Sequence, residues 1–232
     1  MTLPRLEGAN ERLDEPRHDI ATLERSLDHV AAVNRWLGGR RALIRQLSRR
    51  LPGGPAAILD VGTGSADLPL AIARWARRRR RAATITAVDV HPQIAGVAAQ
   101  RTAGSPTIHV AAADGLRLPF PDDTFDLGLL SLTLHHFDGI AQLRVVAELA
   151  RVVRGWLFVG ELHRTWPGYL GARLLAATVW RGDPLTRHDG PMSVLRAFRP
   201  EELRSLAEAA GLRDISVHRH PLFRLVLTAR PG

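Results

Sequence analysis

The sequence contains no cysteine and no lysine, and it has no long apolar segment. The absence of cysteine excludes disulfides, cysteine-ligated zinc, iron–sulfur clusters and a thiolate nucleophile. The longest apolar run, 127–134, is interrupted by glycine, serine and threonine and is far shorter than the ~18 residues that span a bilayer. The first residues, with Arg5 and Glu7, show no apolar core typical of a secretory signal. We therefore expect a cytoplasmic protein without a membrane span.

Positive charge is abundant, but all of it comes from arginine. The 32 basic residues outnumber the 23 acidic ones, and the net charge is +9. Such a field attracts nucleic acid, yet a complete bias toward arginine is more typical of codon usage than of selection for phosphate binding. The densest run, Arg77–Arg81, lies between a predicted helix and a predicted strand, where a solvated loop is expected. A nucleic-acid partner is therefore an alternative that the sequence does not favour.

The hydrophobic pattern predicts one α/β domain over residues 1–232. With 45% hydrophobic residues, a chain of 232 residues can bury a single substantial core. Short apolar runs alternate with helical patterns, which indicates a doubly wound sheet, closed here by an antiparallel strand pair. The seven predicted strands are 57–61, 84–90, 107–112, 125–131, 156–161, 214–220 and 222–229. The predicted helices are 19–37, 40–51, 68–76, 92–102, 140–152 and 200–210.

The same pattern divides the domain into four parts. They are N-terminal helices at 19–51, a core at 56–161, an insertion at 162–198, and a terminal helix and strand pair at 199–232. Within the insertion we expect a helix over 166–181 and a polar loop over 182–191. An insertion of this kind typically lies above a binding site, and the N-terminal helices are a candidate lid.

A glycine-rich turn follows the first strand, in the segment Asp60–Asp67. In a parallel sheet this turn lies at the carboxyl edge, where ligands bind. Gly62 and Gly64 allow a tight turn and a close approach of the backbone to a ligand. The nicotinamide fingerprint requires a third glycine at the position that Asp67 occupies. A dinucleotide is therefore not favoured.

Two further strands end in acidic residues. Asp89 ends the strand at 84–90, where a carboxylate can accept hydrogen bonds from ribose hydroxyls, and Asp114 follows the strand at 107–112. Taken singly, Asp60 could cap its turn and Asp114 could be a turn residue. Because Asp60, Asp89 and Asp114 lie at the ends of three successive strands, together they favour a binding site for one nucleotide cofactor.

These elements resemble motif I and the following motifs of the class I S-adenosylmethionine-dependent methyltransferases, with Ala66 in place of the last glycine. The resemblance covers about 56–161 well and the terminal elements loosely. It implies the class I fold, S-adenosylmethionine as cofactor and S-adenosylhomocysteine as product. It also implies that Asp114 accepts from the adenine amino group. The predicted cofactor-binding residues are Asp60, Gly62, Thr63, Gly64, Asp67, Asp89, Val90, Asp114, Gly115 and Ser131.

Methyl transfer from a sulfonium requires mainly alignment of the acceptor with the methyl group. A general base is needed only for an acceptor that keeps its proton, and the candidates are His135, His163 and His188. For each of the three taken alone, the sequence favours a structural role. His135 is the first to test, because the segment 131–137 resembles the one that lines the methyl-transfer site. The substrate-side candidates are His136, Tyr169, Arg187 and Asp189. No clustered ligand motif predicts a metal.

The acceptor is expected to be a small hydrophobic or aromatic metabolite, methylated on oxygen or carbon. Several apolar residues could line a site for such a ligand, and core packing explains them equally well. They are Leu27, Val30, Trp36, Leu37, Tyr169, Leu170, Leu174, Leu175, Val179 and Trp180. The stretch 118–122 resembles the ubiquinone/menaquinone C-methyltransferase-like subgroup. The segments 34–39 and 187–191 resemble bacterial methyltransferases of polyketide or other secondary metabolism. An RNA methyltransferase and a non-catalytic cofactor-binding regulator are the alternatives, and the sequence leaves the oligomeric state open.

Overall fold

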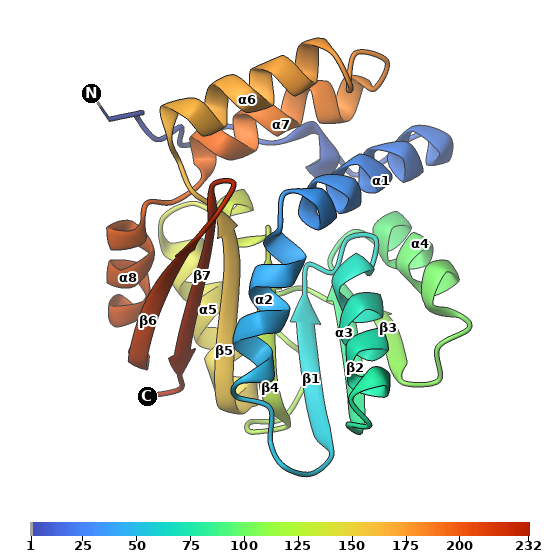
Figure 1. Cartoon of the computed structure of the whole chain (residues 1–232), viewed down its shortest axis with the longest axis vertical. Coiled ribbons are helices and arrows are strands. Elements are labelled where there is room, and N and C mark those ends of the chain that lie inside the picture. The colour runs from blue at the N-terminus through green and yellow to red at the C-terminus, as the bar shows by residue number, and fades with distance from the viewer. Residues whose placement is uncertain (1) are drawn as a thin grey trace.

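The computed structural model describes residues 2–232, and Met1 lies outside the described residues. Seven strands form one sheet in the order β3-β2-β1-β4-β5-β7-β6 (Figure 1). The strands are β1 (Ala56–Val61), β2 (Ala83–Asp89), β3 (Ile108–Ala112), β4 (Phe125–Ser131), β5 (Val153–Leu162), β6 (Arg213–His220) and β7 (Arg224–Arg230). The helices are α1 (Ile20–Trp36), α2 (Gly39–Ser48), α3 (Asp67–Arg78), α4 (Pro92–Thr102), α5 (Ile140–Val152), α6 (Trp166–Ala177), α7 (Pro184–Arg196) and α8 (Pro200–Ala209), with 3₁₀ turns η1 (Arg12–Asp14) and η2 (Leu134–His136).

The sheet is mixed, as the sequence predicts. Strands β1 to β5 pair in parallel, whereas β7 runs antiparallel to both β5 and β6. The expected seven-stranded mixed sheet of the class I methyltransferase fold is therefore confirmed. No described helix is long and apolar enough to cross a membrane.

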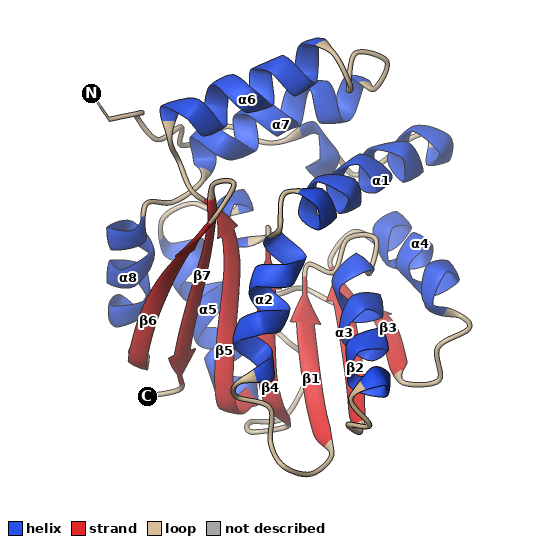
Figure 2. Ribbon diagram, in the orientation of Figure 1, coloured by secondary structure: helices blue, strands red, loops and turns tan. Residues whose placement is uncertain are grey.

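Helices cover both faces of the sheet (Figure 2). On one face α2 and α3 pack their apolar sides on β1, β2, β4 and β5 around Ile58 and Phe158. On the other face α5 and α8 pack around Leu149 and Leu203. Because the central strands are buried on both sides, they are continuous apolar runs rather than alternating ones, as parallel sheets require.

The strand order reverses at β1, which has β2 on one side and β4 on the other. Val61, Asp89 and Ser131 therefore end neighbouring strands at the same edge of the sheet. A topological switch point of this kind is where open α/β sheets bind their ligands. The chain crosses this edge in the turn that follows Val61.

A separate layer of helices lies above that edge (Figure 1). Helix α6 packs on α7, and α1 contacts α7. The expected polar loop over 182–191 is wrong, since Pro184–Arg196 forms α7. Asp183 begins this helix, because its carboxylate accepts hydrogen bonds from the backbone of Leu185 and Thr186, and Pro184 takes the first helical position. Pro191, the last residue of the predicted loop, lies inside the helix.

Candidate active site

A cavity of about 1060 Å³ lies between the carboxyl edge of the sheet and the helical layer above it. One side of it, which we call the cofactor half, is formed by the glycine turn and the ends of β2 and β3. The other side, the acceptor half, is formed by α1, α6, α7, η2 and the segment that precedes α1. The volume is at the upper end of the range for small-molecule sites, so the cavity has room for a nucleotide cofactor and an acceptor together.

The two glycines of the turn serve different purposes. Gly62 has φ +71°, and a Cβ there would collide with the side chain of Thr133. Gly64 has φ +55°, but a Cβ there would meet no protein atom within 4 Å. Gly62 is thus required by packing, while Gly64 leaves the backbone open toward the cavity. Ala66 holds φ 57° without being glycine, so strain is concentrated in this turn.

Asp89 connects the end of β2 to the glycine turn. Its carboxylate accepts hydrogen bonds from the backbone N–H of Gly64 at 3.0 Å and of His91 at 3.1 Å. The side chain is buried yet lines the cavity, and burial raises its pKa. A carboxylate fixed in this way keeps lone pairs free for two ribose hydroxyls.

Asp60 and Asp67 lie at the two ends of the turn and both line the cavity. The Thr63 hydroxyl donates to Asp60 Oδ2 at 2.7 Å, while Oδ1 has no partner among the described residues. Burial raises the pKa of Asp60 to about 7. Asp67 accepts a hydrogen bond from the Asn34 amide at 3.3 Å, and burial raises its pKa as well. The cofactor half therefore contains polar atoms that protein groups leave unsatisfied.

Sequence analysis missed Arg224, the first residue of β7. Its guanidinium lines the cavity, is 2% exposed, and has Nε and Nη1 without partners within residues 2–232. Burial lowers its pKa to about 10, against the opposing effect of Glu161 and Asp67. Nη2 donates to the Val33 carbonyl at 3.4 Å. A buried cation with two unsatisfied donors is costly, and this points to an anionic ligand group. The only signal in the sequence is an arginine placed within an apolar strand.

The other predicted cofactor residues also reach the cavity. Val90, Asp114, Gly115 and Ser131 all line it. Asp114 accepts from the Leu116 backbone N–H at 2.9 Å, so its turn role and a ligand role are compatible. The structure thus brings all ten predicted cofactor-binding residues together.

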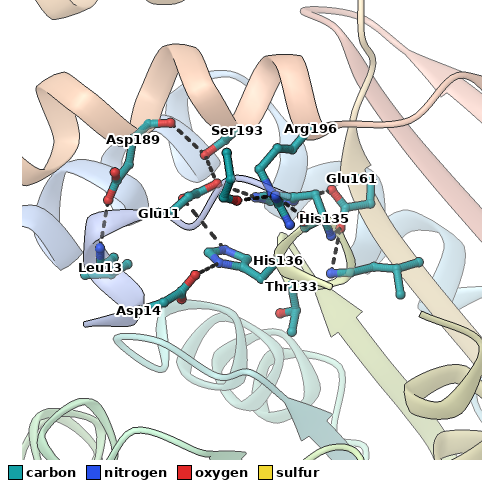
Figure 3. A network of polar contacts seen from close by, with 12 residues as sticks. Glu11, Leu13, Asp14, Thr133, His135, His136, Glu161, Asp189, Ser193 and Arg196 are labelled. Atoms are coloured by element: carbon teal, nitrogen blue, oxygen red, sulfur yellow. Dashed lines mark hydrogen bonds and ion pairs between the residues drawn. The ribbon is translucent and has the colours of Figure 1, made fainter. Parts of the chain in front are cut away.

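In the acceptor half, five side chains form what we call the histidine cluster: Glu11, Asp14, His135, His136 and Glu161 (Figure 3). The two histidines come from η2, directly after β4, and Glu161 from the end of β5. Glu11 and Asp14 belong to the N-terminal segment around η1. Glu11 is 4% exposed, although sequence analysis gave it no role.

Each histidine of the cluster is bound to a carboxylate. His135 Nδ1 lies 2.7 Å from Glu161 Oε2, and His136 Nδ1 lies 2.9 Å from Asp14 Oδ2. Burial alone would raise the pKa of Glu161, but His135 outweighs it and the pKa is lowered. Burial alone would lower the pKa of His136, but Glu11 and Asp14 outweigh it and raise the pKa to about 10.

Helix α7 holds the cluster in place (Figure 3). Asp189 accepts hydrogen bonds from the backbone N–H of Arg12 and of Leu13, both at 2.9 Å. The Ser193 hydroxyl donates to Glu11 Oε1 at 2.8 Å, and Arg196 Nε donates to the His135 carbonyl at 2.8 Å. Asp189, predicted as a substrate-side residue, therefore lines the cavity and also anchors the N-terminal segment.

Other predicted residues are divided between the cavity and the surface. His163 lines the cavity, and burial together with Arg219 lowers its pKa. His188 binds Asp189 at 2.7 Å, Arg187 is exposed, and the Tyr169 hydroxyl accepts from Arg173 at 3.2 Å. These three do not belong to the cavity lining of the described chain. Neither do Trp36, Leu170 and Val179, whereas Leu27, Val30, Leu37, Leu174, Leu175 and Trp180 form its apolar wall.

This sheet, with its antiparallel β7 and its ligand-accessible turn after β1, defines the class I methyltransferases. A family model described as a methyltransferase domain matches residues 59–158. The demethylmenaquinone methyltransferase of Thermus thermophilus is 31% identical over 208 residues, which cover 84% of this chain and 88% of that protein. The ubiquinone/menaquinone biosynthesis C-methyltransferase of Geobacter sulfurreducens is 28% identical over 241 residues, covering 96% of this chain and 89% of that protein.

Solved structures agree on the fold. A SAM-dependent methyltransferase from Aquifex aeolicus superimposes with a TM-score of 0.66 at 16% identity, covering 93% of this chain and 100% of that chain. PigF, solved with SAH, gives a TM-score of 0.66 at 15% identity, covering 91% of this chain and 59% of that one. The chain belongs to the ubiquinone/menaquinone methyltransferase-like family of S-adenosylmethionine-dependent methyltransferases. It is a methyltransferase, and S-adenosylmethionine is its cofactor.

Proposed function

We propose that the enzyme methylates a carbon or an oxygen of a small, mostly apolar metabolite that carries an ionisable ring oxygen, such as a reduced naphthoquinone. The observation that carries this proposal is the cavity, which joins the glycine turn to an apolar wall and a polar cluster. An apolar site with a few polar groups suits a small organic acceptor. The relatives named for quinone methylation support an acceptor of this class.

The cofactor half would hold the nucleoside part and the amino-acid part of S-adenosylmethionine with different residues. Asp89 would accept the ribose hydroxyls, and Asp114 with the Gly115 amide would contact the adenine. Asp67 and Arg224 line the same cavity with opposite charges, which suits the ammonium and the carboxylate of a zwitterion. When bound, S-adenosylmethionine supplies an electrophilic methyl group. The task of these residues is to fix its position, because alignment is most of what the transfer requires.

The acceptor half would hold the ring and its oxygen. Leu27, Val30 and Trp180 belong to the wall that would cover the ring and exclude water. We assign to His135 the contact with the acceptor oxygen, because it is buried, lines the cavity and is oriented by Glu161. Negative charge on that oxygen raises the nucleophilicity of the oxygen and of the adjacent ring carbons. His163 and His188 lie outside the histidine cluster, so neither is assigned this role.

The test is a transfer assay with purified protein, S-adenosylmethionine and one acceptor at a time. A reduced naphthoquinone with a short apolar tail, a simple phenol with the same tail, and an RNA pool represent the acceptor classes. The expected result is a singly methylated organic product, identified by mass spectrometry, with an equimolar amount of S-adenosylhomocysteine. Methylated RNA would move the enzyme to the nucleic-acid class. Tight cofactor binding without any transfer would favour a regulatory protein.

A further inference from the structure

The histidine cluster has an arrangement that hydrogen bonding alone does not explain. Both imidazoles direct Nδ1 at a carboxylate oxygen, His135 at Glu161 and His136 at Asp14. A carboxylate only accepts hydrogen bonds, so the proton of each neutral ring lies on Nδ1. Nε2 of each ring is therefore the atom left for a metal ion, which displaces any proton on Nε2 when it binds. Carboxylates that bind the far nitrogen of a histidine are the usual support for a metal-binding imidazole.

Both Nε2 atoms face the same carboxylate. His135 Nε2 lies 3.6 Å from Glu11 Oε1, and His136 Nε2 lies 3.9 Å from Glu11 Oε2. These distances exceed hydrogen-bonding range. One ligand atom from each of the three residues lies within 4.8 Å of the others. Two imidazole Nε2 atoms and a carboxylate that converge beyond hydrogen-bonding distance leave room for a cation between them.

We propose that Glu11, His135 and His136 bind a divalent transition-metal ion. Two histidines and one carboxylate form a common metal-binding set for zinc and iron. Ligand atoms around a tetrahedral zinc are roughly 3.4 Å apart, given metal–nitrogen distances of about 2.0 Å. The separations of 3.6 and 3.9 Å from the two Nε2 atoms to the two oxygens of Glu11 are close to this value, and all three ligand atoms lie within 4.8 Å of one another, so the ion would draw the three side chains together as it binds.

The surroundings hold these three ligands in place and favour positive charge. Ser193 fixes Glu11, and Arg196 fixes the backbone of His135. The carboxylates of Glu11, Asp14 and Glu161 all lie against the two imidazoles. A divalent cation that replaces protons on Nε2 supplies the positive charge that these three carboxylates favour.

The ion gives the acceptor half a specific chemistry. All three ligands line the cavity, so the remaining coordination positions open toward the acceptor. An acceptor with a hydroxyl on its ring would complete the coordination; its proton would leave to solvent as the oxygen binds, and the ion would stabilise the resulting oxyanion. This consequence rests on the proposed function, with His135 acting on the acceptor oxygen as a ligand of the ion. Metal binding itself does not depend on that function.

The experiment is calorimetric titration of the untagged protein with Co²⁺ or Zn²⁺ alone, together with the visible absorption of the Co²⁺ adduct. We expect micromolar or tighter binding of a single ion per chain. Glu11→Gln and His136→Gln each weaken binding by about 100-fold, and the supporting change Asp14→Asn weakens it by about tenfold. His163→Gln, which alters another histidine of the cavity, leaves metal affinity unchanged.

Circular dichroism and the affinity for S-adenosylhomocysteine show that each variant is folded. Absence of Co²⁺ and Zn²⁺ binding by folded wild-type protein overturns the proposal, and so does equal metal affinity in wild type and Glu11→Gln. In either case the cluster is a hydrogen-bonded network without a metal. Metal binding without methyl transfer to any acceptor would contradict the proposed function and leave the metal site standing.

Discussion

The two halves of the cavity are built in different ways. The cofactor half is local in sequence: Asp60, Gly62, Gly64 and Asp67 lie within one turn, and Asp89 joins them through a backbone hydrogen bond. The acceptor half joins distant segments, as in the bond between Arg12 and Asp189, which are 177 residues apart. A local, backbone-defined site can serve many enzymes unchanged, whereas a site assembled from distant segments can vary with the acceptor. We therefore expect substitutions in the cofactor half to change cofactor affinity, and substitutions in the acceptor half to change the rate of methyl transfer.

The largest expected effect is that of Gly62→Ala in the cofactor half. The new Cβ would meet the Thr133 side chain, and the backbone would keep a φ of +71° that alanine tolerates poorly. Strain and overpacking together cost about 3 kcal/mol of unfolding free energy, and cofactor binding is lost. Urea unfolding and calorimetry measure both quantities. Gly54→Ala is the matched control, because its Cβ meets nothing within 4 Å; an equal loss in that variant would contradict the account.

Asp89→Ala is expected to weaken the cofactor without unfolding the protein. Two charge-assisted hydrogen bonds to ribose are lost, and affinity for S-adenosylhomocysteine falls by about 100-fold. Asp114→Ala, an exposed residue, weakens it by about tenfold because a single bond is lost. Unchanged calorimetric affinity in Asp89→Ala would remove the ribose assignment.

Glu161→Gln tests the acceptor half, because the carboxylate is hydrogen-bonded to His135 and to the backbone of Leu134, whereas it acts on Arg224 only through its charge. The variant keeps the shape of the side chain but loses the charge that orients His135 at 2.7 Å. We expect kcat to fall by about tenfold, in the range found for residues that support a functional histidine, while cofactor affinity stays unchanged. Steady-state kinetics and calorimetry separate the two quantities. A parallel loss of cofactor affinity would show that the halves are not independent.

The last prediction concerns the pH dependence of stability and leaves methyl transfer aside. Burial raises the pKa of Asp60 from 3.8 to about 7. Between these values the folded protein holds a proton that the unfolded chain has released, so the unfolding free energy falls as pH rises and levels off above about pH 7. Asp60→Asn removes this contribution. Urea unfolding at about pH 5 and about pH 8 checks it, and an identical slope in the variant would contradict the raised pKa.

The fold and the cofactor half were predictable because their determinants are local. Apolar runs of strand length gave all seven strands, and the alternation with helices implied the doubly wound sheet. The spacing of Gly62 and Gly64 after a strand located the turn, and the ends of two further strands located Asp89 and Asp114. All of them line the cavity that the structure shows.

Sequence could not give the acceptor half because its contacts are long-range. Glu11 precedes the predicted elements, and it reaches His135 only because α7 anchors the N-terminal segment through Asp189. The polar composition of 182–191 predicts a loop, whereas the structure has helix α7 from Pro184 to Arg196. Arg224 lies within a predicted strand, and its position in the sequence does not show that its side chain reaches the cavity.

The most direct test of the account is transfer of labelled methyl from S-adenosylmethionine, by the purified enzyme, into an extract of the source cells. The extract is then separated into organic-soluble, RNA and protein fractions. The account predicts label in the organic fraction, and loss of that label in Asp89→Ala. Label in nuclease-sensitive material would contradict an acceptor held within the cavity and would give the arginine-rich surface a function.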